Sequence, residues 1–187
     1  MIDKNRKPTK LLWVDLEMTG LDPNQDVIIE VAAEITDFDF NTLATYETIV
    51  KQPKTTVLKR MQANSWWQDF PENRDQFIAN IETGKALATV EKELVEMVVK
   101  HFDNVPAILA GNSIYNDRLF IKRWLPDLDL KLHYRMLDVS SFKILMHGKY
   151  NKLFKKPEVH RAFEDIQGSI AELQYYLDYF RDGLQKS

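Results

Sequence analysis

The segment Leu11-Leu12-Trp13-Val14-Asp15-Leu16-Glu17 runs from four apolar residues into two carboxylates. Residues 10–17 predict a first β-strand, in which side chains two positions apart share a face, so Asp15 and Glu17 point the same way. Two adjacent carboxylates repel each other and lose hydration at the end of a buried strand, and a divalent cation bound by oxygen offsets both effects. A D-x-E pair alone does not distinguish such a metal site from a solvated acidic turn.

A sheet is predicted around this strand. Residues 28–36 are almost continuously apolar and rich in β-branched side chains, which is typical of a strand buried on both faces. The predicted strands are 10–17, 28–36, 43–50, 106–110 and 135–139. The predicted helices are 86–102, 115–124 and a C-terminal segment with an apolar stripe of Ala162, Ile166, Ile170, Leu173, Leu177 and Phe180. This order indicates an α/β fold with a mixed sheet flanked by helices.

Length, composition and charge narrow the class of protein. A chain of 187 residues without repeats or linkers is expected to form one domain over residues 1–187. Because cysteine is absent, any metal would be held by oxygen or imidazole. No apolar run spans a bilayer and no signal peptide is evident, so we expect a cytoplasmic protein without a membrane partner. The net charge of −3 argues against a long nucleic acid but allows a ligand with few phosphates.

Three further residues extend the acidic pair. Asp117 lies three and four residues before apolar positions of the predicted helix 115–124, so it faces the apolar side and needs a polar partner there. His160 and Asp165 would be about 140° apart on one helix, so they meet only if His160 precedes the helix and Asp165 lies in its early turns. Each residue alone is equally consistent with an ordinary role, as a helix-dipole acid or as a surface or capping histidine.

Together these residues occur in blocks that resemble a known family. The blocks are Asp15-Leu16-Glu17-Met18-Thr19-Gly20-Leu21, Gly111-Asn112-Ser113-Ile114 with Asp117-Arg118, His133-Tyr134-Arg135-Met136-Leu137-Asp138-Val139-Ser140, His160 with Ala162 and Asp165-Ile166, and Ala171-Glu172-Leu173 with Tyr175-Tyr176. In this order they resemble the oligoribonucleases, members of a 3′–5′ exonuclease superfamily with four acidic residues and a histidine. The resemblance extends from Leu11 to Phe180, and residues 53–85 match poorly.

The resemblance implies a ribonuclease H-like fold, in which a five-stranded mixed sheet is flanked by helices. It implies hydrolysis of very short RNAs, especially dinucleotides, to mononucleotides from the 3′ end. Two ions, Mg²⁺ or Mn²⁺, would activate water and stabilise the leaving oxygen. Their ligands would be Asp15, Glu17, Asp117 and Asp165. His160 would act as the general base, since imidazole suits proton transfer near neutrality.

The resemblance also implies why the substrate is short. Leu21 would wedge against the terminal bases, and the 5′ phosphate would be capped by Ser113, His133, Tyr134 and Arg135. Tyr134 would come from the other protomer of a homodimer. A capped site cannot pass a long strand, in agreement with the acidic composition. Without the resemblance, residues 133–135 would be interpreted as a surface loop.

Some positions depart from the family pattern. Tyr115 stands where the family usually has glycine, and its ring could reshape the wall of the metal site or the dimer contact. Val159 replaces the usual threonine before the histidine, and Glu164 replaces an aspartate before Asp165.

Other residues have less direct assignments. Either Trp66 or Trp67 is a candidate for the aromatic residue that stacks on a base. Glu30 and Glu34 on the second predicted strand are interpreted as structural.

Two other functions fit the same sequence. One is a proofreading or tRNA-trimming exonuclease of the same superfamily, with a longer substrate. The other is a catalytically silent module that binds short nucleotides, in which Tyr115 has spoiled the metal site. Metal-dependent turnover of a dinucleotide would separate the enzyme from the binding module.

Overall fold

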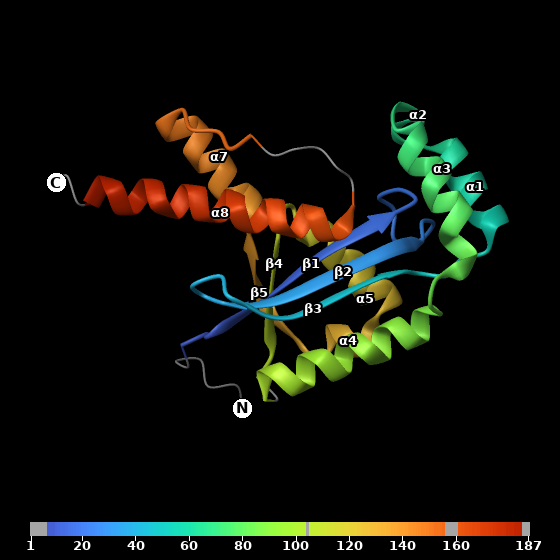
Figure 1. Cartoon of the computed structure of the whole chain (residues 1–187), viewed down its shortest axis with the longest axis horizontal. Helices are drawn as coiled ribbons and strands as arrows, with labels where there is room; N and C mark the ends of the chain where they lie inside the picture. The colour runs from blue at the N-terminus through green and yellow to red at the C-terminus, as the bar shows by residue number, and fades with distance from the viewer. Residues whose placement is uncertain (1–6, 104, 156–160, 185–187) are drawn as a thin grey trace.

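A five-stranded sheet forms the centre of the computed structural model, which describes residues 7–103, 105–155 and 161–184 (Figure 1). Its strands are β1 (Lys10–Met18), β2 (Ile28–Asp37), β3 (Thr42–Ile49), β4 (Ala107–Gly111) and β5 (Leu132–Asp138). They are ordered β3-β2-β1-β4-β5 across the sheet. The first three strands are antiparallel neighbours, whereas β4 and β5 run parallel to β1. The predicted mixed sheet is therefore confirmed.

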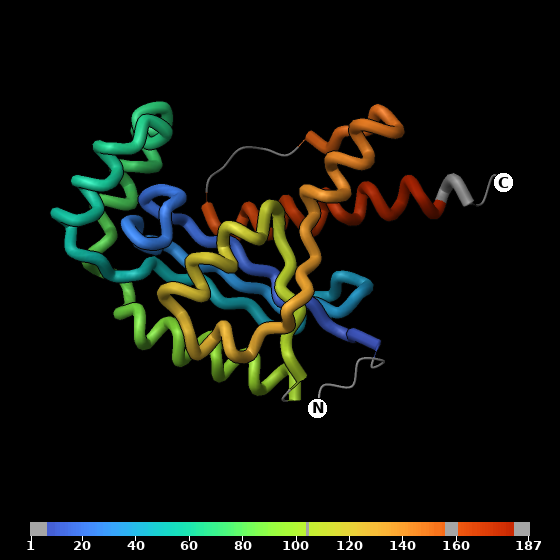
Figure 2. Tube along the Cα trace, turned by 180° about the vertical axis from the view of Figure 1, so that it is seen from behind, coloured from blue at the N-terminus to red at the C-terminus, as the bar shows by residue number. Residues whose placement is uncertain are grey.

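Helices cover both faces of the sheet and one of its ends (Figure 1, Figure 2). In the described part of the chain they are α1 (Lys54–Ala63), α2 (Trp66–Asp69), α3 (Pro71–Asn80), the 3₁₀ turn η1 (Ile81–Thr83), α4 (Leu87–Phe102), α5 (Tyr115–Trp124), α6 (Pro126–Asp129), α7 (Val139–Tyr150) and α8 (Ala162–Leu184). Helices α4 and α5 pack on one face and α8 on the other. Within these described ranges, no helix combines the length and apolar character that a membrane crossing requires.

The alternation of side chains along β1 decides where its carboxylates point. The even-numbered apolar residues of β1 belong to the core cluster shared with α4 and α5. The odd-numbered residues Leu11 and Trp13 belong to the cluster completed by α8. Asp15 and Glu17 continue this odd-numbered series, so the pleat of β1 directs both carboxylates toward α8.

A third core cluster attaches α1, α2 and α3 to β2 and to the residue before it. Its buried members are Val27, Ile29, Val57, Met61, Trp67, Phe77 and Ile81. Periodicity predicts no helices in residues 53–85, because these helices are short and each buries only one or two residues. Packing against the sheet, rather than a long amphipathic stripe, stabilises them.

The prediction for β5 was wrong at its start. The strand begins at Leu132, three residues before the predicted boundary, and Leu132 pairs with Ala107 of β4. The Arg118 guanidinium supports this extension by donating to the His133 carbonyl at 3.1 Å. Residues 133–135 therefore lie on an edge strand instead of in a surface loop.

Two helical features also differ from the prediction. Helix α7 was not predicted; it begins at Val139, directly after Asp138, whose carboxylate caps the helix by accepting a hydrogen bond from the Ser140 N–H. Leu177 belongs to the predicted apolar stripe of α8 but is 41% exposed. This part of α8 extends past the edge of the sheet, so its apolar side chains do not pack against the strands (Figure 1).

Candidate active site

Three of the predicted carboxylates meet at one end of the sheet. Asp15 and Glu17 of β1 and Asp165 of α8 have oxygen atoms that all lie within 4.8 Å of one another. The prediction that Asp15 and Glu17 share a face is confirmed, and Asp165 lies in the first turn of α8, where it was expected. The site thus joins the end of the central strand to the start of the C-terminal helix.

Asp117 lies beside this group and is held by backbone. It is 7% exposed, which confirms that its side chain faces inward from α5. Its partner is the N–H of Leu16, which donates to Oδ1 at 3.0 Å. Since Leu16 lies between Asp15 and Glu17, the fourth carboxylate is fastened to the strand that carries the first two.

The electrostatics of the group favour a cation. Burial, followed by the charges of Asp165, Glu30 and Asp117, raises the pKa of Glu17 to about 8, although Arg161 lowers it. Burial also raises the pKa of Asp117 to about 7, against hydrogen bonds from the Leu16 N–H and its own N–H that lower it. Carboxylates that hold protons near neutrality form a donor set that fits a divalent cation preferring oxygen ligands.

Glu30 anchors the start of α8 above this group. The carboxylate accepts from Arg161 Nη2 at 2.8 Å and from the Ala162 N–H at 3.1 Å. Glu34, further along β2, accepts from Thr42 at 2.6 Å and from Gln167 of α8. Both glutamates therefore form structural hydrogen bonds, as expected, and bind α8 to the sheet.

The residues predicted just before and at the start of α8 are only partly described by the structure. His160 and Val159 lie outside the described residues, so the predicted general base is not located. Glu164 is exposed in the first turn of α8, next to Asp165.

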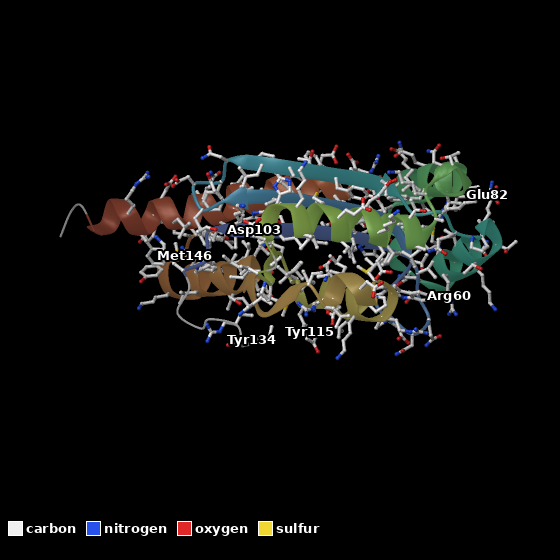
Figure 3. All side chains as sticks on the ribbon, turned by 90° about the horizontal axis from the view of Figure 1, so that it is seen from below. Arg60, Glu82, Asp103, Tyr115, Tyr134 and Met146 are labelled. Atoms are coloured by element: carbon white, nitrogen blue, oxygen red, sulfur yellow. The ribbon has the colours of Figure 1, made fainter. Side chains whose placement is uncertain are left out.

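Tyr115 does not enter the metal site. It is 58% exposed, whereas Asp117, two residues later and about 200° away around α5, points inward. Figure 3 shows Tyr115 on the same side of the molecule as Tyr134 and on the opposite side from β3. The ring therefore does not line the carboxylate group within one chain, and the silent binding module loses its basis. An effect of Tyr115 on a dimer contact stays a prediction.

A tightly bonded loop between β1 and β2 presents Leu21. Asp26 accepts from the Thr19 hydroxyl at 2.9 Å and from the Asp22 N–H at 3.0 Å. A Cβ on Gly20 would lie 2.5 Å from the Asp26 carboxylate, so any other residue here would force that carboxylate to shift. Leu21 follows directly and is 74% exposed, which leaves its side chain available for contact.

Contact with this loop distinguishes the two tryptophans that were candidates for stacking on a base. Trp67 is 1% exposed and donates from Nε1 to the Thr19 carbonyl at 3.1 Å, so it cannot stack on a base. Trp66 is half-buried and packs on Phe70 with ring centroids 4.6 Å apart. Trp66 is the remaining candidate.

The predicted phosphate-binding residues fall into two places. Ser113 follows β4, where its N–H donates to Asp138 Oδ1 at 3.0 Å and to Ser140 Oγ at 2.9 Å. On β5, the His133 ring stacks on Tyr134 with centroids 4.5 Å apart, and the Arg135 guanidinium lies 5.2 Å from the Tyr134 ring. Tyr134 itself is 68% exposed.

The register of the sheet separates Tyr134 from the acidic group. Leu12 pairs with Leu109, which pairs with Met136, so Tyr134 lies level with the start of β1. Glu17 is seven residues further along β1, which corresponds to roughly 20 Å along the strands. Within one chain, Tyr134 and the carboxylates are therefore at opposite ends of the sheet.

Three polar residues near the site were not singled out from the sequence. Asp138, Asn112 and Glu172 form hydrogen bonds around Ser113 and α8. The Asp138-Val139 pair carried a signal, because an aspartate directly before an apolar residue is a common N-cap at a helix start. Asn112 and Glu172 lie in blocks that carry the family resemblance, but no local pattern assigned them a role.

Comparisons with known proteins agree with this geometry. Residues 12–173 match the exonuclease family model RNase_T. A probable oligoribonuclease of Caenorhabditis elegans is 39% identical over 170 residues, covering 89% of this chain and 86% of the relative. The oligoribonuclease of Pseudomonas paraeruginosa is 38% identical, covering 94% and 98%, and that of Corynebacterium glutamicum is 43% identical, covering 89% and 78%.

Solved structures show the same fold at low sequence identity. Exonuclease I of Methylocaldum szegediense has a TM-score of 0.62 at 16% identity, covering 88% of this chain and 39% of that one. E. coli exonuclease I in complex with a 5cy-dT13 oligonucleotide has a TM-score of 0.62 at 15% identity, covering 92% and 43%. This chain spans about two fifths of those proteins, so they show the fold alone: the five-stranded mixed sheet is the ribonuclease H-like exonuclease fold. From the family model and the full-length relatives, we conclude that the chain belongs to the RNase_T exonuclease family and, within it, to the oligoribonucleases.

Proposed function

We propose that this 3′–5′ exonuclease hydrolyses very short RNAs, especially dinucleotides, to mononucleotides. The observation that carries the proposal is the group of three carboxylates from β1 and α8, with a fourth fastened to the Leu16 N–H. Such a group is suited to phosphodiester hydrolysis assisted by divalent ions. The relatives named oligoribonucleases support the class of substrate.

Asp15, Glu17, Asp117 and Asp165 would hold two divalent ions, Mg²⁺ or Mn²⁺. When bound, such ions activate water and stabilise the leaving oxygen. Glu17 must lose its proton to become a ligand, because its pKa in the ion-free chain is raised to about 8. His160 would then take the proton from the attacking water. Arg161, the next residue, is anchored to Glu30.

The substrate end of the site would measure the length of the RNA. Ser113 and Arg135 would bind the 5′ phosphate, Arg135 through two parallel hydrogen bonds, and His133 would complete the cap. The exposed Leu21 would wedge against a base, with Trp66 stacking nearby. Fixing the 5′ phosphate fixes its distance from the carboxylates, so only very short oligomers would place a phosphodiester correctly.

A homodimer would supply Tyr134 from the second protomer. Residues 133–135 all lie roughly 20 Å along the strands from the carboxylates of the same chain, which supports a contribution from the second protomer. Tyr134 is also 68% exposed on the edge strand β5, where another chain can approach. The cytoplasmic location expected from the sequence stays a prediction.

A length series tests the proposal. 5′-Phosphorylated RNAs of two to ten nucleotides are incubated with Mg²⁺ or with Mn²⁺, and the rate of mononucleotide release is measured at each length. We expect the dinucleotide to be cleaved fastest and the rate to fall with length. Rates that rise with length would instead identify a proofreading or trimming exonuclease, and binding without turnover would identify a binding module.

A further inference from the structure

Glu172 of α8 is a buried carboxylate outside the acidic group. Its exposed fraction is 0%. The Tyr176 hydroxyl donates to Oε1 at 2.8 Å, the Asn112 amide donates to Oε2 at 3.0 Å, and Lys143 Nζ lies 3.6 Å from Oε1. Burial and the hydrogen bond to Glu172 raise the pKa of Tyr176 to about 12, so its hydroxyl stays a donor at neutral pH. Burying a carboxylate is unfavourable unless its oxygens are paired in this way.

The carboxylate fixes the direction of a chain of hydrogen bonds. Because a carboxylate only accepts, Asn112 must turn its NH₂ group toward Glu172 and its carbonyl oxygen away. That oxygen accepts from the Ser140 hydroxyl at 3.1 Å. With its proton directed to Asn112, the Ser140 oxygen is left as an acceptor. The Ser113 N–H donates to it at 2.9 Å and so positions this residue, whereas the Ser113 hydroxyl, 3.1 Å from Ser140 Oγ, must turn its proton toward the phosphate when the substrate binds.

Ser113 needs such support because of its backbone. Its φ is 49°, in the left-handed region that residues other than glycine rarely adopt. Hydrogen bonds from its N–H to Asp138 and Ser140 hold this conformation. The chain that begins at Glu172 therefore ends at a strained residue, whose hydroxyl is the proposed ligand of the 5′ phosphate.

The same asparagine also contacts the helix that carries Asp165. Asn112 Nδ2 lies 3.0 Å from Ser169 Oγ, and the Ser169 hydroxyl donates to the Asp165 carbonyl at 2.8 Å. One amide thus connects the turn of Ser113 with the first turns of α8. These are the two ends of the site between which a short substrate would lie.

We propose that Glu172 is a positioning residue for the 5′-phosphate site, because it orients Asn112 and, through Ser140, the Ser113 hydroxyl relative to α8. The inference rests on the proposed function, since it takes Ser113 to bind the 5′ phosphate. Glu172 itself touches neither the substrate nor the ions. Its effect is expected on substrate preference rather than on the chemical step.

The experiment compares kcat/KM for a 5′-phosphorylated and a 5′-hydroxyl RNA dinucleotide with Mg²⁺. Glu172→Gln keeps the shape of the side chain but adds a donor, so Asn112 is no longer forced into one orientation. We expect the preference for the 5′ phosphate to fall about three- to tenfold. Asn112→Ala breaks the chain at its first link and should lower the preference similarly. The double variant should lose no more than either single variant, because both lie in one chain.

Tyr176→Phe is the matched control. It removes the other hydrogen bond to Glu172 but leaves the contact with Asn112, so the preference should remain at the wild-type value. A purely structural role for Glu172 would lower thermal stability and both substrates' rates in proportion. That result, or a wild-type preference in Glu172→Gln, overturns the inference while leaving the cap in place. A wild-type protein without any preference for the 5′ phosphate would overturn the proposed cap and this inference together.

Discussion

The four carboxylates are held in different ways by the residues around them. Asp117 is fixed by a backbone N–H at 3.0 Å, whereas Asp15, Glu17 and Asp165 crowd one another within 4.8 Å. Burial, and after it the neighbouring charges, raise the pKa of Glu17 to about 8, so in the ion-free chain this carboxyl keeps its proton near neutrality. Ion binding and the loss of this proton are therefore coupled.

Glu17→Gln should stabilise the ion-free protein. The Glu17 carboxyl ionises near pH 4.5 in the unfolded chain but near pH 8 in the folded chain. The folded state thus binds more protons between these values, and wild-type stability falls as pH rises through this window. The variant should lack this loss of stability and show a higher melting temperature than the wild type at pH 8. Each kcal/mol of added unfolding free energy raises the melting temperature of a chain of this size by about 2–4 °C.

Thermal melts in the presence of a chelator, from pH 5 to pH 9, provide the measurement. Asp165→Asn serves as a comparison, because it removes one of the charges that raise the Glu17 pKa. In this variant the melting temperature should fall with pH no more steeply than in the wild type. Equal melting temperatures for Glu17→Gln and wild type at pH 8 would contradict the raised pKa of Glu17.

His160→Ala should lose most of the rate while keeping ion and substrate binding. A general base contributes typically about 10²–10⁴-fold, and oxygen ligands alone suffice to hold the ions. The rate is measured on a dinucleotide, and ion binding by titration calorimetry. Loss of ion binding in the variant would make His160 a ligand instead of a base.

At the scale of the elements, the β1–β2 loop is held by hydrogen bonds to the Asp26 carboxylate. Its hydrogen bonds converge on Asp26, and α1 and α2 hold it from the other side through Asn64 and Trp67, which both donate to the Thr19 carbonyl at 3.1 Å. The poorly matching segment 53–85 therefore supports the loop that presents Leu21.

Gly20→Ala should disturb this loop without unfolding the sheet. The added Cβ would lie 2.5 Å from the Asp26 carboxylate, so the hydrogen bonds of Asp26 must shift and Leu21 moves with them. We expect KM for the dinucleotide to rise several-fold, since loss of one or two hydrogen bonds changes binding by about that factor.

Gly148→Ala is the matched control, because a Cβ there meets nothing within 4 Å and the residue lies inside α7. It should raise stability by about 0.5–1 kcal/mol and leave KM unchanged. Steady-state kinetics and thermal melts of both variants distinguish the cases. A wild-type KM in Gly20→Ala would show that the loop conformation does not matter for binding.

At the scale of the whole molecule, one chain does not bring all of the predicted site residues together. The sheet register places Tyr134 at the opposite end from the carboxylates. Activity is therefore expected to depend on dimer formation. Mixed dimers of two variant chains can test this in one buffer and at one protein concentration.

Tyr134→Ala and Asp15→Asn should each be inactive or nearly so as separate homodimers. After mixing and subunit exchange, a hybrid dimer rebuilds one complete site, on the chain that retains Asp15. Random exchange should restore about a quarter of wild-type activity, because half of the dimers are hybrids with one of two sites intact. Dinucleotide turnover is measured before and after exchange, which is followed by mass spectrometry. Proven exchange without rescue, or a fully active monomer, would contradict the shared site.

The sequence by itself determined the strands and helices with strong periodicity and the shared face of Asp15 and Glu17. It also determined the inward direction of Asp117, because period-2 and period-3.6 patterns are local properties of the chain. The family resemblance supplied the remaining site residues. Local patterns did not predict α1 to α3 or α7, whose short apolar faces are completed by distant segments.

Only the tertiary structure decided how distant residues meet. The packing of α8 on the sheet brings Asp165 to Asp15 and Glu17, and the parallel pairing of β1, β4 and β5 places Tyr134 at the opposite end. Burial removed Trp67 from the candidates for base stacking and linked Glu172 to Asn112, 60 residues apart in the chain. These outcomes depend on sheet register and on packing between segments far apart in sequence, and no local pattern of side chains encodes either of them.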